Sequence, residues 1–335
     1  MMKKVTIADV AQHAGVSKST VSQYLNQRYD YMGEQTKTRI EEAIAVLEYK
    51  PNYLARSLKQ KSTTTIGVIV ANILHVFSTQ VIRAIEDVSN EHNFHVIICN
   101  ADDNPEKEKK YIEMLQAKQV DGIIAVPTGG NVALYHELVK ENYPIVFIDR
   151  LMSGVEIDTV LLDNEKASFL AVEVLIKRGY SKIAVISPPL NPNITPRDER
   201  VNGYKKALKQ YQIPFNENYL VTCEISEMQG SIKQLIQQQA PPTAILAMND
   251  RVLKEVLTYV KIHKLRIPED IALIGIDDVP YADIYNPALT TVAQPAFEMG
   301  EKAAKLLFER IQNKEQSNQT EVYRFNPELI IRESC

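Results

Sequence analysis

Tryptophan is absent from the sequence, and cysteine is scarce. The three cysteines, Cys99, Cys223 and Cys335, are far apart and odd in number. They match neither a disulfide framework nor the paired spacing of a zinc site, and they suit a reducing compartment. We therefore expect no metal ion in this protein.

Long apolar runs are also missing. Stretches such as Ile66 to Ala71 are far shorter than the roughly 20 residues that a membrane-spanning helix needs. The N-terminus turns polar again at Asp9, before an apolar secretory core develops. We therefore expect a cytoplasmic protein with no membrane partner.

Catalytic signatures are missing as well, because the sequence has no Gly-rich phosphate loop and no nucleophile elbow. Asp277 and Asp278 are adjacent, so their side chains do not converge as metal ligands do, and no histidine cluster supports them. We expect no catalytic residue and no cofactor.

Length and charge indicate several domains with different partners. A chain of 335 residues, 45% of them apolar, is long enough for two or three globular units. The net charge of -4 divides into +4 for residues 1–61 and -8 for the remainder. A basic head on an acidic body is typical of nucleic-acid contact through the head.

The first 50 residues are predicted to be helical. Apolar positions recur at helical spacing, and Thr6 with Asp9 forms a capping box before the first helix. Gly15 permits a tight turn, and Ser17 caps a second helix over 18–25. A plain helical hairpin is the alternative, but this arrangement at a basic N-terminus favours a helix-turn-helix that binds DNA.

A new pattern begins after Pro51 and the polar run Ser62–Thr65. Compact apolar runs then alternate with amphipathic stretches, which predicts parallel sheets in two similar lobes. The predicted strands lie near 66–71, 95–99, 121–126, 145–148, 182–186, 219–222, 243–247 and 271–275. The predicted helices lie near 78–92, 105–118, 131–142, 164–178, 197–211, 228–239 and 250–264.

The domains are therefore a small all-α headpiece over 1–50, a hinge over 51–63 and a two-lobed α/β unit over 64–335. One lobe is expected to hold 64–149 with 278–294, and the other 150–277 with 295–335. Ligands of open parallel sheets bind beyond the carboxyl ends of the strands, so the cleft between the lobes is the expected pocket.

Particular residues carry a resemblance to a known family. Val5 to Ala11, Ala14 to Ser17, Thr20 to Ser22 and Leu25 with Asn26 resemble the headpiece of the lac repressor (LacI/GalR) family of transcription regulators. The similarity continues along the chain, whose two lobes are similar to type I periplasmic binding proteins. It implies a dimer on a near-palindromic operator.

The resemblance assigns DNA contacts. It implies that Lys18, Ser19 and Gln23 read bases in the major groove. It implies contacts at or near the phosphates for the polar residues around them, which are Ser17, Thr20, Ser22, Asn26, Tyr31 and Asn52. Thr6 is also expected to bind DNA.

Two positions depart from the family pattern. The family commonly has arginine at Gln23, and because Gln pairs best with adenine, we expect an operator that differs at that base. Gly33 replaces the usual serine or threonine cap of the third helix, which costs about a few tenths of a kcal/mol.

The segment Tyr49 to Lys59 resembles the hinge helix of the family, whose Leu58 wedges between base steps in the minor groove. Such a short helix is marginal in water, so it would order only on DNA. A flexible linker with a stray apolar Leu58 is the alternative from composition alone.

The resemblance also implies which residues line the ligand cleft. These are Phe77, Ser78, Asp149, Arg150, Arg200, Asn249, Asp250, Asp277 and Asp278, with Arg197 nearby. Asn249 is also expected to cap a helix. If the arginines face the ligand, a carboxylate or phosphate is expected on it, whereas the alternative for Arg150 and Arg200 is a salt bridge between the lobes.

A weaker resemblance concerns the effector. The segments Ser22 to Met32 and Asn100 to Lys107 look like those of regulators of ketodeoxygluconate and hexuronate breakdown. A sugar acid such as 2-keto-3-deoxygluconate is therefore the expected effector, with a neutral sugar as the alternative. A protein corepressor stays open, and so does the choice between induction and corepression.

Two functions from other classes stay as alternatives. A solute-binding receptor would fit the lobes alone, but it would need export and would lack Thr6 to Lys59. An enzyme that uses the cleft would show turnover of candidate substrates.

Overall fold

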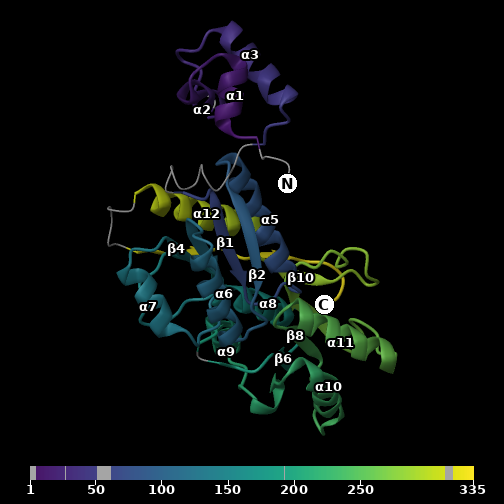
Figure 1. The fold of residues 1–335 in the computed structure, drawn as a ribbon. Coiled ribbons are helices and arrows are strands. Elements are labelled where there is room, and N and C mark those ends of the chain that lie inside the picture. Colours follow the sequence, from purple (N-terminus) through teal and green to yellow (C-terminus); the bar gives the residue numbers. More distant parts are fainter. Residues whose placement is uncertain (1–4, 27, 51–61, 192, 314–319) are drawn as a thin grey trace. The chain divides into compact units, whose positions relative to one another are not determined.

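The computed structural model describes residues 5–26, 28–50, 62–191, 193–313 and 320–335. The chain forms two compact units, Met1–Thr63 and Thr64–Cys335 (Figure 1). Asn52 and Leu58, which the sequence predicts to lie in a hinge that contacts DNA, fall outside the described residues.

The described part of the smaller unit contains the helices α1 (Ile7–Ala14), α2 (Lys18–Leu25) and α3 (Glu34–Val46). Their core is formed by Val10, Ala11, Ala14, Val21, Ile40, Ala43 and Tyr49. The carboxylate of Asp9 accepts hydrogen bonds from the Thr6 backbone N–H and hydroxyl, both at 2.7 Å. Gly15 ends α1 with a left-handed φ of 64°, which turns the chain into α2.

The larger unit contains two six-stranded sheets. The first has the order β11-β5-β4-β3-β1-β2, and its paired strands are parallel. The second has the order β12-β10-β9-β8-β6-β7, in which only the β10–β12 pair is antiparallel. The α/β class with parallel sheets predicted from the sequence is confirmed.

The strands of the first sheet are β1 (Thr65–Val70), β2 (His95–Asn100), β3 (Gly122–Ala125), β4 (Ile145–Ile148), β5 (Thr159–Leu162) and β11 (Val322–Phe325). Those of the second sheet are β6 (Ile183–Ser187), β7 (Leu220–Thr222), β8 (Ala244–Ala247), β9 (Ala272–Ile276), β10 (Thr290–Ala293) and β12 (Glu328–Ile330).

Helices cover both faces of each sheet (Figure 1). Those of the first lobe are α5 (Val76–Glu91), α6 (Pro105–Ala117), α7 (Val132–Lys140) and α12 (Ala296–Gln312). Those of the second lobe are α8 (Asn164–Lys177), α9 (Thr195–Gln210), α10 (Met228–Gln237) and α11 (Asp250–His263), with short 3₁₀ turns at Glu217–Tyr219 and Ile225–Glu227. The central strands are buried on both faces, which explains their nearly continuous apolar sequences.

The composition of the lobes differs from the expectation. β5 and β11 lie in the first sheet, and α12 packs against α5 and strands β3, β4 and β5. β10, expected in the first lobe, pairs with β9 in the second sheet. The expected boundaries at 150, 278 and 294 are therefore wrong, because the chain adds a fifth strand to the first sheet before it crosses. Among the described residues, no helix has the length and apolar character of a membrane span.

Candidate functional site

The second helix of the small unit presents one buried and one open side. Val21 is fully buried, whereas Ser17, Lys18, Ser19 and Gln23 are exposed. Ser17 Oγ accepts a hydrogen bond from Thr20 N at 3.1 Å, which confirms the predicted cap. The exposed side of α2 is thus free to contact a partner.

The other proposed DNA-contacting residues are arranged around it. Thr6 and Tyr31 are exposed, and Tyr31 is the most open of the large apolar side chains. Thr20, Ser22 and Asn26 are partly buried, and Asn26 Nδ2 donates to Ser22 O at 2.6 Å. Gly33 precedes α3 and gives it no side-chain cap.

In the larger unit, the strand order identifies the position of a cleft. β1 lies between β2 and β3, and β6 lies between β7 and β8, so each sheet reverses its winding there. Ligands of such sheets bind beyond the carboxyl ends of the strands at this reversal. The loops that follow β1, β3, β6 and β8 are therefore the candidate site.

These loops meet in two pairs. After β1 and β8, His75 of the first lobe contacts Asp250 of the second, with 2.5 Å between Nδ1 and Oδ1. After β3 and β6, Gly129 lies so close to Asn193 that an added Cβ would be 2.2 Å from Asn193 Cβ. The two lobes thus touch at both reversals.

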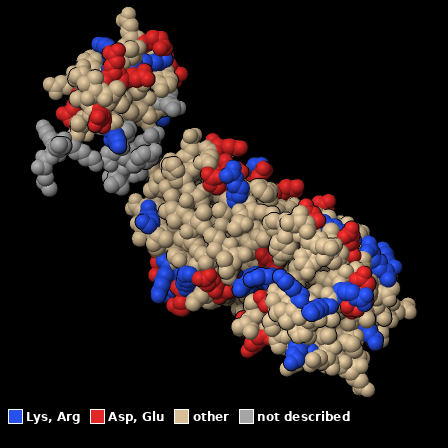
Figure 2. Space-filling view, turned by 90° about the vertical axis from the view of Figure 1, so that its right-hand side faces the viewer, with Lys and Arg blue, Asp and Glu red and all other residues tan. Residues whose placement is uncertain are grey.

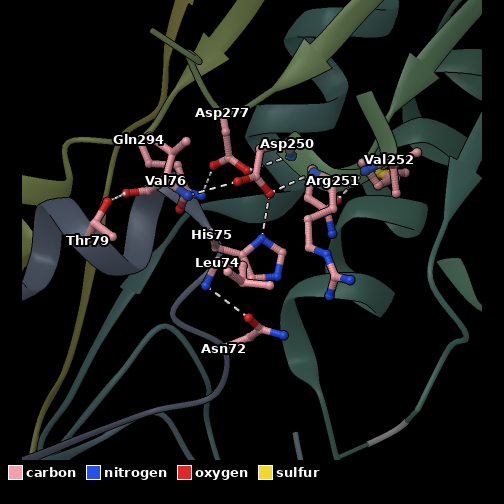
Figure 3. Close-up of polar contacts among 12 residues, drawn as sticks. Asn72, Leu74, His75, Val76, Thr79, Asp250, Arg251, Val252, Asp277 and Gln294 are labelled. Carbon is pink, nitrogen blue, oxygen red and sulfur yellow. Dashed lines mark hydrogen bonds and ion pairs between the residues drawn. The ribbon is translucent and has the colours of Figure 1, made fainter. Parts of the chain in front are cut away.

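A chain of hydrogen bonds runs across the lobes at the first contact (Figure 3). Asp250 accepts from Val76 N at 2.8 Å, and its own N–H donates to Asp277 at 3.1 Å. Gln294 Nε2 donates to Asp277 Oδ1 at 2.6 Å. Burial acts to raise the pKa of Asp250, but the hydrogen bond and charge of His75 outweigh it and hold that pKa below its ordinary value.

Two aspartates hold equivalent positions at strand ends. Asp149 follows β4 and Asp277 follows β9, and both have a left-handed backbone, with φ of 69° and 83°. Burial raises the pKa of both carboxyls. For Asp149 it outweighs the charges of Arg150 and Arg200, which lower the pKa. For Asp277 the negative charge of Asp250 raises the pKa further. Left-handed aspartates and shifted pKa values are typical of functional sites.

The three arginines have different partners. Arg150 Nη1 lies 2.7 Å from Asp103 Oδ1 within the first lobe. Arg197 Nη2 lies 3.8 Å from Asp103 Oδ2 and so forms a loose pair between the lobes. Arg200 is buried and donates to Asn164 Oδ1 at 2.8 Å and to Met248 O at 2.5 Å, and both of these contacts lie within the second lobe.

A cavity of about 220 Å³ lies beside the chain of hydrogen bonds. Its walls are Val76, Phe77, Gln80, Asp277, Asp278 and residues 293–298, with Gln294 and Glu298 among them. The charged side chains of these walls are acidic, and Asp278 is paired with Arg332 at 2.8 Å.

The structure divides the proposed cleft residues into groups. Phe77, Asp277 and Asp278 line the cavity, Asp250 joins the lobes through His75 and Val76 N, and Asp149, Arg150 and Arg197 gather near Asp103. The others serve the fold: Asn249 Oδ1 accepts from Val252 N at 2.9 Å and caps α11 as predicted, Arg200 braces the second lobe, and Ser78 is buried in α5.

Sequence reasoning missed His75, Asp103 and Gln294 as members of the site. Asp103 lies in the segment Asn100 to Lys107, which at the level of sequence indicates only a resemblance to regulators of ketodeoxygluconate and hexuronate breakdown. In the sequence, only the adjacent aspartates Asp102 and Asp103 hint at a left-handed backbone there. Among the residues described, no group of three or more His, Cys, Asp and Glu could hold a metal ion.

Comparison with known proteins gives one consistent result. Residues 6–52 match the bacterial regulatory proteins of the lacI family, and residues 172–335 match a periplasmic binding protein-like domain. The chain is 52% identical to the probable HTH-type transcriptional regulator EndR of Paenibacillus polymyxa, over 98% of both chains. It is 31% identical to the HTH-type transcriptional regulator KdgR of Bacillus subtilis (strain 168), over 98% of this chain and 97% of that one.

The fold is similar to that of a repressor whose structure has been solved on DNA. That structure is the lac repressor dimer bound to operator and the anti-inducer ONPF. The similarity has a TM-score of 0.84 at 26% identity and covers 99% of both chains.

Proposed function

Since this chain belongs to the lacI family of bacterial regulatory proteins, we propose that it is a cytoplasmic repressor of carbohydrate catabolism whose operator affinity is controlled by a small ligand. The exposed face of α2 is the observation that carries this function. Lys18, Ser19 and Gln23 read base edges, and the surrounding hydroxyls and amides contact phosphates. The relatives are named as transcription regulators, and we propose no catalytic role.

A footprint on candidate operators tests the proposal. We expect protection of a short near-palindromic site that survives excess unrelated duplex, and a change in protection when the effector is added. Binding that depends only on salt and never on sequence, with every ligand tried, would overturn it.

The active form is proposed to be a homodimer. The larger unit exposes apolar side chains at Leu74, Ile98, Ile284, Phe297 and Ile331. The face in Figure 2 has a broad area without charged residues, bordered by mixed positive and negative side chains. Uncharged areas of this kind are typical of interfaces, and light scattering should give the mass of two chains.

The effector is proposed to be a sugar acid, because Arg150 and Arg197 converge on one carboxylate between the lobes. A neutral sugar is the second candidate, because the walls of the cavity carry acidic side chains and amides rather than arginines. Titration calorimetry with 2-keto-3-deoxygluconate and with neutral sugars separates the two. Tight binding of neutral sugars only would exclude the sugar acid.

Control of DNA binding is proposed to follow from closure of the lobes around the ligand. A ligand that bridges the lobes favours one arrangement of them, and by linkage operator and effector change each other's affinity by the same factor. The footprint with and without ligand gives the sign of this coupling.

A further inference from the structure

Asp103 forms ion pairs with two arginines, Arg150 of its own lobe and Arg197 of the second lobe. Asp103 follows β2, and its two oxygens point to different guanidinium groups. Oδ1 lies 2.7 Å from Arg150 Nη1, and Oδ2 lies 3.8 Å from Nη2 of Arg197, which belongs to the second lobe. Asp103 therefore bridges two positive charges that would otherwise face each other.

The backbone holds this carboxylate in a strained position. Asp102 and Asp103 are both left-handed, with φ of 51° and 54°, a conformation that is uncommon for residues other than glycine. The strain is held by Asp103 N, which donates to Ala71 O at 2.8 Å, and by Asp102, which pairs with Lys107 at 2.5 Å. Such a conformation is retained where the position of the side chain matters.

The contact between Asp103 and Arg150 is incomplete. Arg150 Nη1 forms the ion pair with Asp103 Oδ1, whereas the buried Nε of Arg150 has no hydrogen-bond partner among the described residues. Arg150 Nε forms only a long ion pair with Asp149 Oδ2, at 3.8 Å. A buried guanidinium normally uses its donors, so the unused Nε points to an acceptor supplied by a ligand.

The negative charge of Asp103 lies between the positive charges of Arg150 and Arg197. Burial acts to raise the pKa of Asp103, but the Arg150 charge outweighs it and keeps that pKa below its ordinary value. Burial and the charge of Arg150 lower the pKa of Arg197. Asp103 is therefore ionised, and it cancels one positive charge of a pair that would attract any carboxylate.

We propose that Asp103 is a specificity-determining residue of the cleft, which occupies the place between Arg150 and Arg197 that the carboxylate of an acidic effector takes. An acidic ligand binds by displacing the Asp103 side chain, and a neutral ligand leaves it in place. This inference rests on the proposed role of the cleft as the effector site.

Rescue by a small anion tests the arginine pair without a known effector. Asp103→Ala leaves a space flanked by two guanidinium groups, so acetate should raise its melting temperature relative to chloride at equal ionic strength. The wild type and Asp103→Ala/Arg150→Gln should show no such difference. Asp102→Ala is the matched control for loss of a loop carboxylate. An equal response to acetate in all four proteins overturns the proposal.

Asp103→Asn keeps the size of the side chain and tests selectivity. We expect it to bind 2-keto-3-deoxygluconate or galacturonate at least about tenfold more tightly than the wild type does, because a competing negative charge is gone. The affinity for galactose should not change. Unchanged or weaker binding of the acid overturns the inference and leaves the regulator function intact.

The two hypotheses can fail separately. If acetate rescues Asp103→Ala in an Arg150-dependent manner but no sugar binds and no operator is protected, the inference stands and the proposed function fails.

Discussion

Asp250 caps a helix that belongs to the other lobe. The N-cap of α5, His75, provides no side-chain cap of its own, and the Asp250 carboxylate accepts from Val76 N in the first turn of α5. A carboxylate at a helix N-terminus is favoured by the unpaired N–H groups and the helix dipole. This contact exists only while the lobes are close, so it stabilises that arrangement.

We expect Asp250→Asn to lower the free energy of unfolding by about 1–3 kcal/mol at pH 7. The native pKa of Asp250 is below its ordinary value. The advantage of the wild type is therefore present above the ordinary carboxyl pKa and is lost as the pH falls through the native pKa. Denaturant unfolding between pH 7 and pH 3 measures it.

The control for this variant is Asp87→Asn, which breaks the exposed pair of Asp87 with Arg83 and should cost less than about 1 kcal/mol. A difference between wild type and Asp250→Asn that grows toward pH 3 would contradict the assigned role.

Gln23 is the residue by which base preference is tested. Gln23→Arg should shift the preferred base from adenine to guanine at one position of each half-site, with a discrimination of about 1–3 kcal/mol. Selection from randomised operators measures the change. Gln12→Arg, on the exposed part of α1, adds the same charge and should leave the sequence preference unaltered.

Local residues were predictable, and residues that act through distant contacts were not. The caps by Ser17 and Asn249 depend on spacings of three residues, which the sequence displays. The pair His75–Asp250 joins positions 175 residues apart, and no local pattern contains it. The proposed DNA and cleft roles stay predictions until variants are measured.

At the scale of elements, α6 holds the loop that follows β3. Glu108 is fully buried, and its carboxylate accepts hydrogen bonds from Thr128 N, Thr128 Oγ1, Asn131 Nδ2 and Tyr135 OH at 2.6–3.1 Å. Since a buried carboxylate with four donors is well satisfied, it fixes the loop that carries Gly129.

We expect Glu108→Ala to destabilise the protein by at least about 3 kcal/mol, because several buried donors lose their acceptor. Tyr135→Phe removes one donor and should cost about 1 kcal/mol. Urea unfolding compares the two, and similar losses for both variants would show that the carboxylate does not organise the loop.

Most strands and helices before residue 276 were predicted, whereas β5 and the elements after residue 289 were missed. β5, β10 and β11 have four residues each and β12 has three, but β4 and β7 are as short and were predicted, so length alone does not explain the omission. α12 was missed although its apolar residues recur at helical spacing. The sheet that a strand joins depends on which other strands it pairs with. The spacing of apolar residues does not reveal these pairings, so it could not give the boundaries of the lobes.

For the whole molecule, the close approach of Gly129 to Asn193 limits how near the lobes can come. Gly129 has a φ of 88°, and Gly154 has a φ of 79° with open space around it. Alanine at either position costs about 1–2 kcal/mol in backbone strain. Only at Gly129 does the new methyl group meet the other lobe.

Gly129→Ala should therefore hold the lobes apart and weaken effector binding, whereas Gly154→Ala should only lose stability. Small-angle X-ray scattering should show a larger radius of gyration for Gly129→Ala than for the wild type. Equal radii for both variants and the wild type would mean that the loops yield without opening the lobes.

The last strands of the chain complete different sheets. β11 is an edge of the first sheet, β12 is an edge of the second, and Ser334 Oγ accepts from Thr290 N at 2.8 Å and donates to Leu273 O at 2.6 Å. A ribosome must therefore translate almost this whole sequence before either sheet has all its strands, although α1, α2 and α3 emerge first. A premature stop codon late in the message would therefore spare α1, α2 and α3 and damage both lobes of the larger unit.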